Sequence, residues 1–93
     1  MSLTSVDAFD ASQYWQLSEQ VSLRDEAFGA LAYHHGNRRL VFLKSRELVE
    51  LIRRLGEFDS ADEAISELAP ADQRDRYVTA LASLHRSDLL NGR

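Results

Sequence analysis

Three histidines are the side chains of this sequence best suited to acid–base or metal chemistry. His34 and His35 are adjacent, and His85 lies near the end of a predicted helix. Neighbouring residues of a strand point to opposite faces, so His34 and His35 do not converge on one metal ion. The chain has no cysteine, which excludes disulfides and thiolate ligands. We therefore expect no metal site, and we expect the adjacent histidines to be polar residues at the mouth of a hairpin.

Carboxylate pairs offer little more for catalysis. Asp25 and Glu26 are adjacent, whereas Asp59, Asp62 and Glu63 surround a predicted helix start, where negative charge is stabilised anyway. The sequence contains neither a nucleophile elbow nor a glycine-rich phosphate loop. With 93 residues and four glycines, it has little material for a deep pocket. We expect a protein that is not an enzyme.

The composition predicts one globular domain. Hydrophobic residues make up 44% of the chain, and there is a single proline. No apolar run is long enough to span a membrane, and the first residues do not resemble a signal peptide. A cytoplasmic protein that does not bind membranes is therefore expected. We interpret residues 1–13 as a flexible N-terminal arm and residues 14–93 as the domain.

The elements that must position any binding site begin with strands. Val21 and Leu23 alternate with polar residues, and two apolar runs flank a hairpin signal at Gly36-Asn37. A turn centred there pairs Tyr33 with Leu40 and residue 31 with residue 42. These four large side chains share one face, and we expect that face to be the core. Gly29 indicates a bulge or a close backbone approach.

Three helices are predicted to follow. Ser45 can cap a helix over 46–55, and Ser60 with Glu63 forms a capping box for a short helix that Pro70 ends. Asp72 can cap a third helix that runs to about residue 85. Three strands and then three helices predict an α+β domain with a three-stranded antiparallel sheet, which is the element inventory of a winged helix.

Charge is unevenly distributed along the chain. The net charge of −4 argues against a general nucleic-acid binder. Residues 31–56, however, carry six basic and two acidic groups, a local charge of +4. If the strand at 39–44 lies at the sheet edge, its backbone can pair with an added peptide strand. Two rival interpretations remain open: a winged-helix DNA-binding regulator that uses Arg74 and Arg76, and a homodimer formed through the exposed edge.

The sequence resembles a known family. The residues that carry the resemblance are Val21, Leu23, Arg24, Glu26, Phe28, Gly29, Ala30, Leu31, Tyr33, Arg38, Arg39, Leu40, Phe42, Leu43, Tyr77, Ala80, Leu81 and Leu84. This pattern is similar to the peptide chaperones of mycofactocin biosynthesis, the MftB family, which in turn resemble PqqD and other recognition elements of ribosomally made peptides. It covers roughly residues 14–90. One departure is Ser87-Asp88, which stands where PqqD-like domains usually have a glycine-containing turn.

The resemblance implies a winged-helix-like domain that binds the leader of a precursor peptide as an added strand. The partner would be a radical S-adenosylmethionine maturase, to which the iron–sulfur cluster and the S-adenosylmethionine belong. The chaperone itself would hold no cofactor and bind no nucleic acid. Carried over by position, the expected peptide-binding residues are Arg39, Leu40, Val41, Phe42, Leu43, Lys44, Arg74, Tyr77, Val78, Leu81 and His85.

Overall fold

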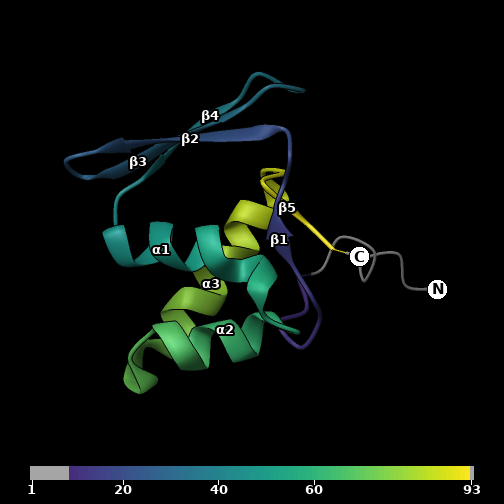
Figure 1. Ribbon diagram of the computed structural model, residues 1–93, viewed down its shortest axis with the longest axis vertical. Coiled ribbons are helices and arrows are strands. Elements are labelled where there is room, and N and C mark those ends of the chain that lie inside the picture. Colours follow the sequence, from purple (N-terminus) through teal and green to yellow (C-terminus); the bar gives the residue numbers. More distant parts are fainter. Residues whose placement is uncertain (1–8, 93) are drawn as a thin grey trace.

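A computed structural model describes residues 9–92 of the chain. The strands are β1 (Gln16–Leu17), β2 (Val21–Glu26), β3 (Gly29–His34), β4 (Leu40–Leu43) and β5 (Leu90–Asn91), and the helices are α1 (Arg46–Arg54), α2 (Ala61–Leu68) and α3 (Arg74–Arg86). Two 3-10 turns, Leu55–Glu57 and Ala71–Gln73, precede α2 and α3. Figure 1 shows β2, β3 and β4 as one layer above the three helices. The predicted α+β fold, with a three-stranded antiparallel sheet followed by three helices, is confirmed.

The main sheet has the order β2-β3-β4, so β3 is central and β4 is an edge strand. Tyr33 pairs with Leu40 and Leu31 pairs with Phe42, as the hairpin signal predicts. The turn is longer than two residues, because the Arg38 N–H donates to the His34 carbonyl at 2.8 Å. Arg38, with φ of 64°, takes the left-handed conformation in this turn.

The prediction of which sheet face forms the core is wrong. Leu40 and Phe42 are 55% and 57% exposed, whereas Ala30 and Ala32 on the opposite face are fully buried. Helix α1 contacts both β3 and β4 on that alanine face. Small side chains on the central strand let the helix approach the sheet closely, which large ones would prevent. The large side chains consequently point away from the helices.

Gly29 lies at a close approach between two strands. Its φ is 148°, and a Cβ built there would overlap the carbonyl oxygen of Leu43 on β4. Other residues rarely adopt this backbone conformation, so glycine is required at the start of β3. The close backbone approach expected from the sequence is confirmed.

Hydroxyl caps begin the first two helices as predicted. The Ser45 hydroxyl accepts the Leu48 N–H, and the Ser60 hydroxyl accepts the Glu63 N–H, both at 3.1 Å. The prediction that Asp72 caps the third helix is wrong. Asp72 lies within the 3-10 turn, and α3 begins at Arg74 without a side-chain cap.

The end of α3 is closed by an aspartate in the left-handed conformation. Asp88 has φ of 65°, and the following Leu89 N–H reaches back to the Leu84 carbonyl at 3.0 Å. Aspartate tolerates this conformation better than most residues, so it occupies the place of a terminating glycine. The turn directs Leu89 and Leu90 into the core, where both are buried.

Two-residue strands join the segments at either end of the domain. Gln16 pairs with Asn91 and Leu17 with Leu90 in the small β1-β5 sheet. Residues 9–13, the last part of the expected N-terminal arm, make backbone hydrogen bonds with the domain. The carbonyls of Ala11 and Gln13 accept backbone N–H groups at the start of α2 at 2.8 and 3.0 Å. Residues 1–8, the rest of the expected arm, lie outside the described residues.

Candidate functional site

The free edge of β4 is the main feature of the candidate site. The His34 N–H donates to the Arg39 carbonyl at 2.9 Å, which fixes the direction of hydrogen bonding in the β3–β4 ladder. Because antiparallel residues alternate in direction, Val41 and Leu43 turn their backbone groups to β3, whereas Leu40 and Phe42 turn theirs outward. Within residues 9–92, no strand pairs with β4 on that outward side. Backbone donors and acceptors are therefore available to an added strand.

A small cleft continues from the end of β4. It has a volume of about 70 Å³ and lies between the start of α1 and the first half of α3. Its lining residues are Ser45, Leu48, Arg76, Tyr77 and Ala80. Only Tyr77 of this group was among the expected binding residues. Tyr77 and Ala80 are three residues apart on a helix, and this spacing could have indicated that they share one face. Leu48 had the pattern of a core residue, so the sequence did not indicate that it lines the cleft.

Cations divide into paired and unpaired groups. Arg24, Arg53, Arg54 and Arg74 form ion pairs, and Arg74 contacts both Asp62 and Asp75. Within residues 9–92, the cations without an ion pair are Arg38, Arg39, Lys44, Arg46, Arg76 and Arg86. All of these except Arg86 adjoin β4 in sequence or line the cleft. The positive charge is therefore available where a strand would bind.

The structure separates the expected binding residues into accessible and buried groups. Leu43 and Leu81 are core residues, 2% and 0% exposed. His85 lies at the far end of α3, with its ring 4.8 Å from that of Trp15. Val78 packs partly against the core. Arg39, Leu40, Phe42, Lys44 and Arg74 are exposed, and Val41 and Tyr77 are half-buried, but Arg74 is held in its ion pairs.

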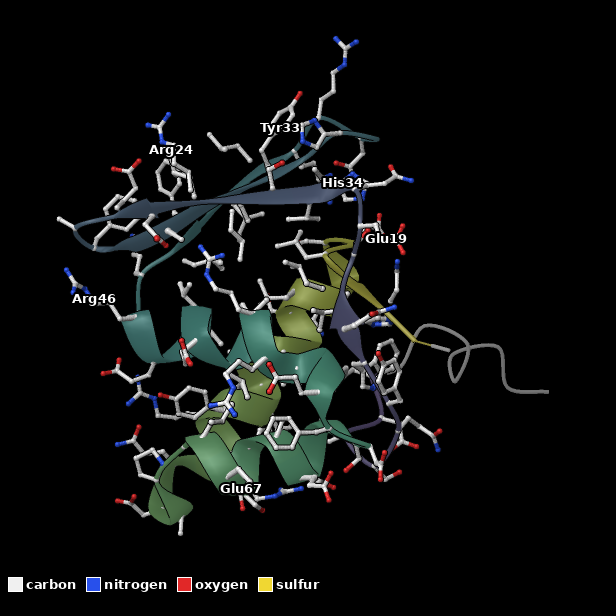
Figure 2. All side chains as sticks on the ribbon, in the orientation of Figure 1. Glu19, Arg24, Tyr33, His34, Arg46 and Glu67 are labelled. Carbon is white, nitrogen blue, oxygen red and sulfur yellow. The ribbon has the colours of Figure 1, made fainter. Side chains whose placement is uncertain are left out.

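The outer face of the sheet carries an apolar cluster, which we call the outer patch. It comprises Phe28, Leu31, Tyr33, Leu40 and Phe42. The rings of Phe28 and Phe42 lie 6.0 Å apart. Figure 2 shows Tyr33 and Arg24 projecting from the sheet on the side away from the helices. On β2 the same face is polar, with Arg24 paired to Glu26 at 2.8 Å, so the patch is displaced towards β4.

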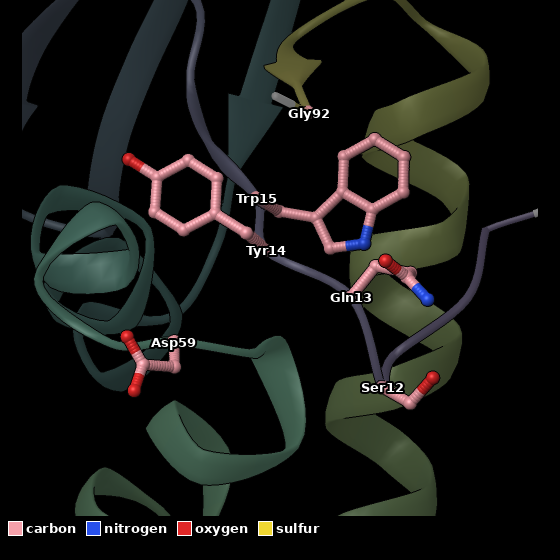
Figure 3. A pocket seen from close by; sticks show the side chains of 6 residues that line it. All are labelled: Ser12, Gln13, Tyr14, Trp15, Asp59 and Gly92. Carbon is pink, nitrogen blue, oxygen red and sulfur yellow. The ribbon is translucent and has the colours of Figure 1, made fainter.

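A larger cavity lies away from this sheet. It has a volume of about 360 Å³ and is lined by Ser12, Gln13, Tyr14, Trp15, Asp59 and Gly92. Figure 3 shows Tyr14 and Trp15 on either side of the chain that enters β1. None of its lining residues belongs to β2, β3 or β4.

The described part of the chain contains no group of three or more histidine or acidic side chains that could hold a metal ion. Among residues 9–92, no helix is long and apolar enough to cross a membrane.

Comparison with known proteins shows which family the chain resembles. The model of the peptide chaperone MftB family matches residues 14–91. The chain belongs to the MftB peptide chaperone family. It is 42% identical to the peptide chaperone MftB of Mycolicibacterium smegmatis over 83 residues, which cover 88% of this chain and 81% of the relative. The corresponding protein of Mycobacterium tuberculosis is 37% identical, with 88% of this chain and 76% of the relative covered.

Membership of the MftB family confirms the resemblance drawn from residues 14–90. The family is one of peptide chaperones, a non-catalytic role, which confirms the expectation that the protein is not an enzyme. The alternative of a DNA-binding regulator finds no support in this family. No solved structure matches the chain, so the expected winged-helix arrangement stays a prediction.

Proposed function

We propose that the protein binds the leader of a ribosomally made precursor peptide, the mycofactocin precursor, as a fourth strand beside β4. The observation that supports this most directly is the outward direction of the backbone groups of Leu40 and Phe42 on an unpaired edge. The cleft beyond β4 supplies a place for a side chain of the peptide. The contact residues are then Arg39, Leu40, Val41, Phe42 and Lys44 on the strand side, with Leu48, Arg76, Tyr77, Val78 and Ala80 from the helices. Leu43 and Leu81 support this surface from beneath.

The chaperone then presents the peptide to a radical S-adenosylmethionine maturase. A protein that binds both the leader and the enzyme raises the effective concentration of the reactive end at the active site. Micromolar binding of the leader corresponds to about 8 kcal/mol. Main-chain pairing along β4, together with two or three buried side chains, is a plausible source of that free energy.

Self-association through β4 would compete with the peptide. Two β4 edges paired antiparallel about Val41 would set Leu40 opposite Phe42 of the other copy. The same register would bring the turn that carries Arg38 of one copy towards Lys44 of the other, at both ends of the paired strands. Like charges in opposing positions destabilise a strand pair. A peptide with acidic residues at these positions has no such penalty, so we place the peptide and not a second copy at this edge.

The decisive experiment compares two substitutions of Phe42 by titration calorimetry with the precursor peptide. Phe42→Ala removes the side chain and keeps the backbone N–H, whereas Phe42→Pro also removes the N–H that points outward. Proline is tolerated on an edge strand where its missing N–H faces solvent. We expect Phe42→Pro to bind at least tenfold more weakly than Phe42→Ala, and a scrambled leader not to bind.

Equal affinities of the two variants would contradict strand addition. The fold of each variant is checked by amide spectra before titration. Should the proline variant not fold, the peptide itself supplies the test, because N-methylation of alternate leader amides blocks pairing only at positions that face β4. Insensitivity to N-methylation at every leader position would exclude pairing with β4.

A further inference from the structure

The outer patch is the surface that the proposed peptide leaves uncovered. A strand added to β4 lies about 5 Å from β4 and about 10 Å from β3. It can therefore contact Leu40 and Phe42 but does not reach across to Leu31 and Tyr33 on β3. Phe28, in the β2–β3 turn, packs against Phe42 and is 45% exposed. An apolar area remains beside the bound peptide.

The fold does not require apolar side chains on this face of the sheet. The core is formed on the alanine face, and the outer patch supports no further layer of the described residues. Phe28, Leu40 and Phe42 are the only large hydrophobic side chains among residues 9–92 that are exposed, and all three lie in the patch. A contiguous apolar area that contains every such residue indicates an interaction surface, whereas scattered single residues would not.

The charges around the patch indicate what kind of surface covers it. Arg46 reaches the Ala27 carbonyl beside Phe28 at 3.4 Å, and Lys44 follows β4 directly. Arg38 and Arg39 lie at the other end of β4, in the turn before Leu40. Within residues 9–92 none of these four cations has an ion pair. The patch is thus apolar at its centre, with unpaired positive charge at both ends of its β4 side.

A second copy of this chain is a poor partner for such a surface. A two-fold dimer would place the same patch on both sides of the interface and would gather the four cations of each copy around one boundary. Like charges brought together in this way oppose association. A partner surface with apolar residues surrounded by carboxylates would match the outer patch in polarity and would carry the opposite charge.

We propose that the outer patch is the docking surface for the enzyme that receives the bound peptide, and that this enzyme presents an apolar area bordered by acidic side chains. This inference rests on the proposed function, because it takes the β4 edge to be occupied by the peptide. The patch adjoins that edge, so one enzyme surface can contact the patch and the added strand together. The enzyme then holds the chaperone without displacing the peptide.

The test uses the double variant Phe28→Ser/Leu31→Thr, which removes apolar area outside the peptide contacts and introduces at position 31 a β-branched residue that suits a strand. Arg24→Thr, on the same sheet face but outside the patch, is the matched control. Each protein is titrated with the precursor peptide and, separately, with the purified radical S-adenosylmethionine maturase, both with and without peptide. We expect the double variant to bind the maturase at least tenfold more weakly and the peptide within twofold of wild type. The control should match wild type in both titrations.

Three results would overturn the inference. The first is unchanged affinity of the double variant for the maturase. The second is a parallel loss of peptide affinity, which would assign the patch to the peptide site. The third is a wild-type dimer in sedimentation that the double variant converts to monomers, which would make the patch a contact between copies. Failure of the wild-type protein to bind the peptide would instead contradict the proposed function, and the titration of maturase alone would still report on the patch.

Discussion

The backbone N–H of Gly36 donates a hydrogen bond of 3.0 Å to Nδ1 of His34. The Asn37 N–H donates to the same nitrogen at 3.1 Å. Because a backbone N–H can only donate, Nδ1 is the acceptor of both hydrogen bonds. His34 is 9% exposed, so a buried imidazole closes the turn that leads into β4.

Replacing His34 with alanine should loosen this turn. His34→Ala removes the acceptor for two backbone N–H groups and is expected to lower the free energy of unfolding by about 1–3 kcal/mol. Hydrogen exchange at the Gly36 and Asn37 amides should accelerate. His35→Ala, which alters the exposed neighbour, is the control and should leave both amides protected. Unchanged exchange in His34→Ala would show that the ring does not hold the turn.

Gly29 provides a test of the approach between β3 and β4. Gly29→Ala should destabilise the protein by about 2 kcal/mol or more, since alanine is strained at this positive φ and its Cβ meets backbone that cannot move aside. Gly92→Ala is the matched control, because a Cβ there would make ordinary contacts of 3.6 Å or longer. Chemical denaturation measures both. Similar midpoints for the two variants would argue against the close approach.

The sequence predicts the order of elements better than the side of the sheet that is buried. Alternation identifies which residues share a face, and the register of Tyr33 with Leu40 follows from the turn. Deciding between the faces requires knowledge of what packs on them. Ala30 and Ala32 are weakly hydrophobic individually, and only the close approach of α1 explains their burial.

The cleft could not be predicted from the sequence, because it also depends on how the elements pack. Leu48 comes from α1, whereas Arg76 and Ala80 come from α3, and their meeting depends on how the two helices cross. The ion pairing of Arg74 with Asp62, which leaves Arg76 as the available cation, also depends on the packing of α2 against α3. Local patterns do not encode such crossings.

The assignment of the buried face can be tested by changing residue size on each side. Ala32→Leu should cost about 1–3 kcal/mol, because added volume in a packed core strains its surroundings. Leu40→Thr, on the exposed face, should change the free energy of unfolding by less than about 0.5 kcal/mol. Urea denaturation distinguishes the two cases. A larger effect from Leu40→Thr would restore the original assignment of the core.

Ser12 should control the ionisation of Asp10. The Ser12 hydroxyl and backbone N–H donate to the Asp10 carboxylate at 2.7 and 2.9 Å, and they hold its pKa below the ordinary value of 3.8. A carboxyl whose pKa is lowered on folding stabilises the fold above the unfolded pKa, and this contribution is lost as pH falls through the folded pKa.

Ser12→Ala should therefore raise the pKa of Asp10 towards 3.8, although not fully, because the backbone N–H remains. Carboxyl carbon shifts followed by NMR between pH 2 and 6 measure this directly. Ser66→Ala, an exposed substitution on α2, is the control and should leave the Asp10 titration unchanged. An unaltered Asp10 pKa in Ser12→Ala would mean that the hydroxyl does not bond the carboxylate in solution.

Salt should weaken peptide binding through the unpaired cations and not through the paired ones. Arg38, Arg39, Lys44 and Arg76 should attract acidic residues of the leader, whereas Arg74 is already bonded to Asp62. Exposed charges are screened beyond about 8 Å at physiological ionic strength, so association should slow as sodium chloride is raised. Arg76→Gln should reduce this salt dependence more than Arg74→Gln, as measured by stopped-flow fluorescence of a labelled leader. Association that is independent of salt would exclude electrostatic attraction, and a larger effect from Arg74→Gln would place the attracting charge on the paired arginine.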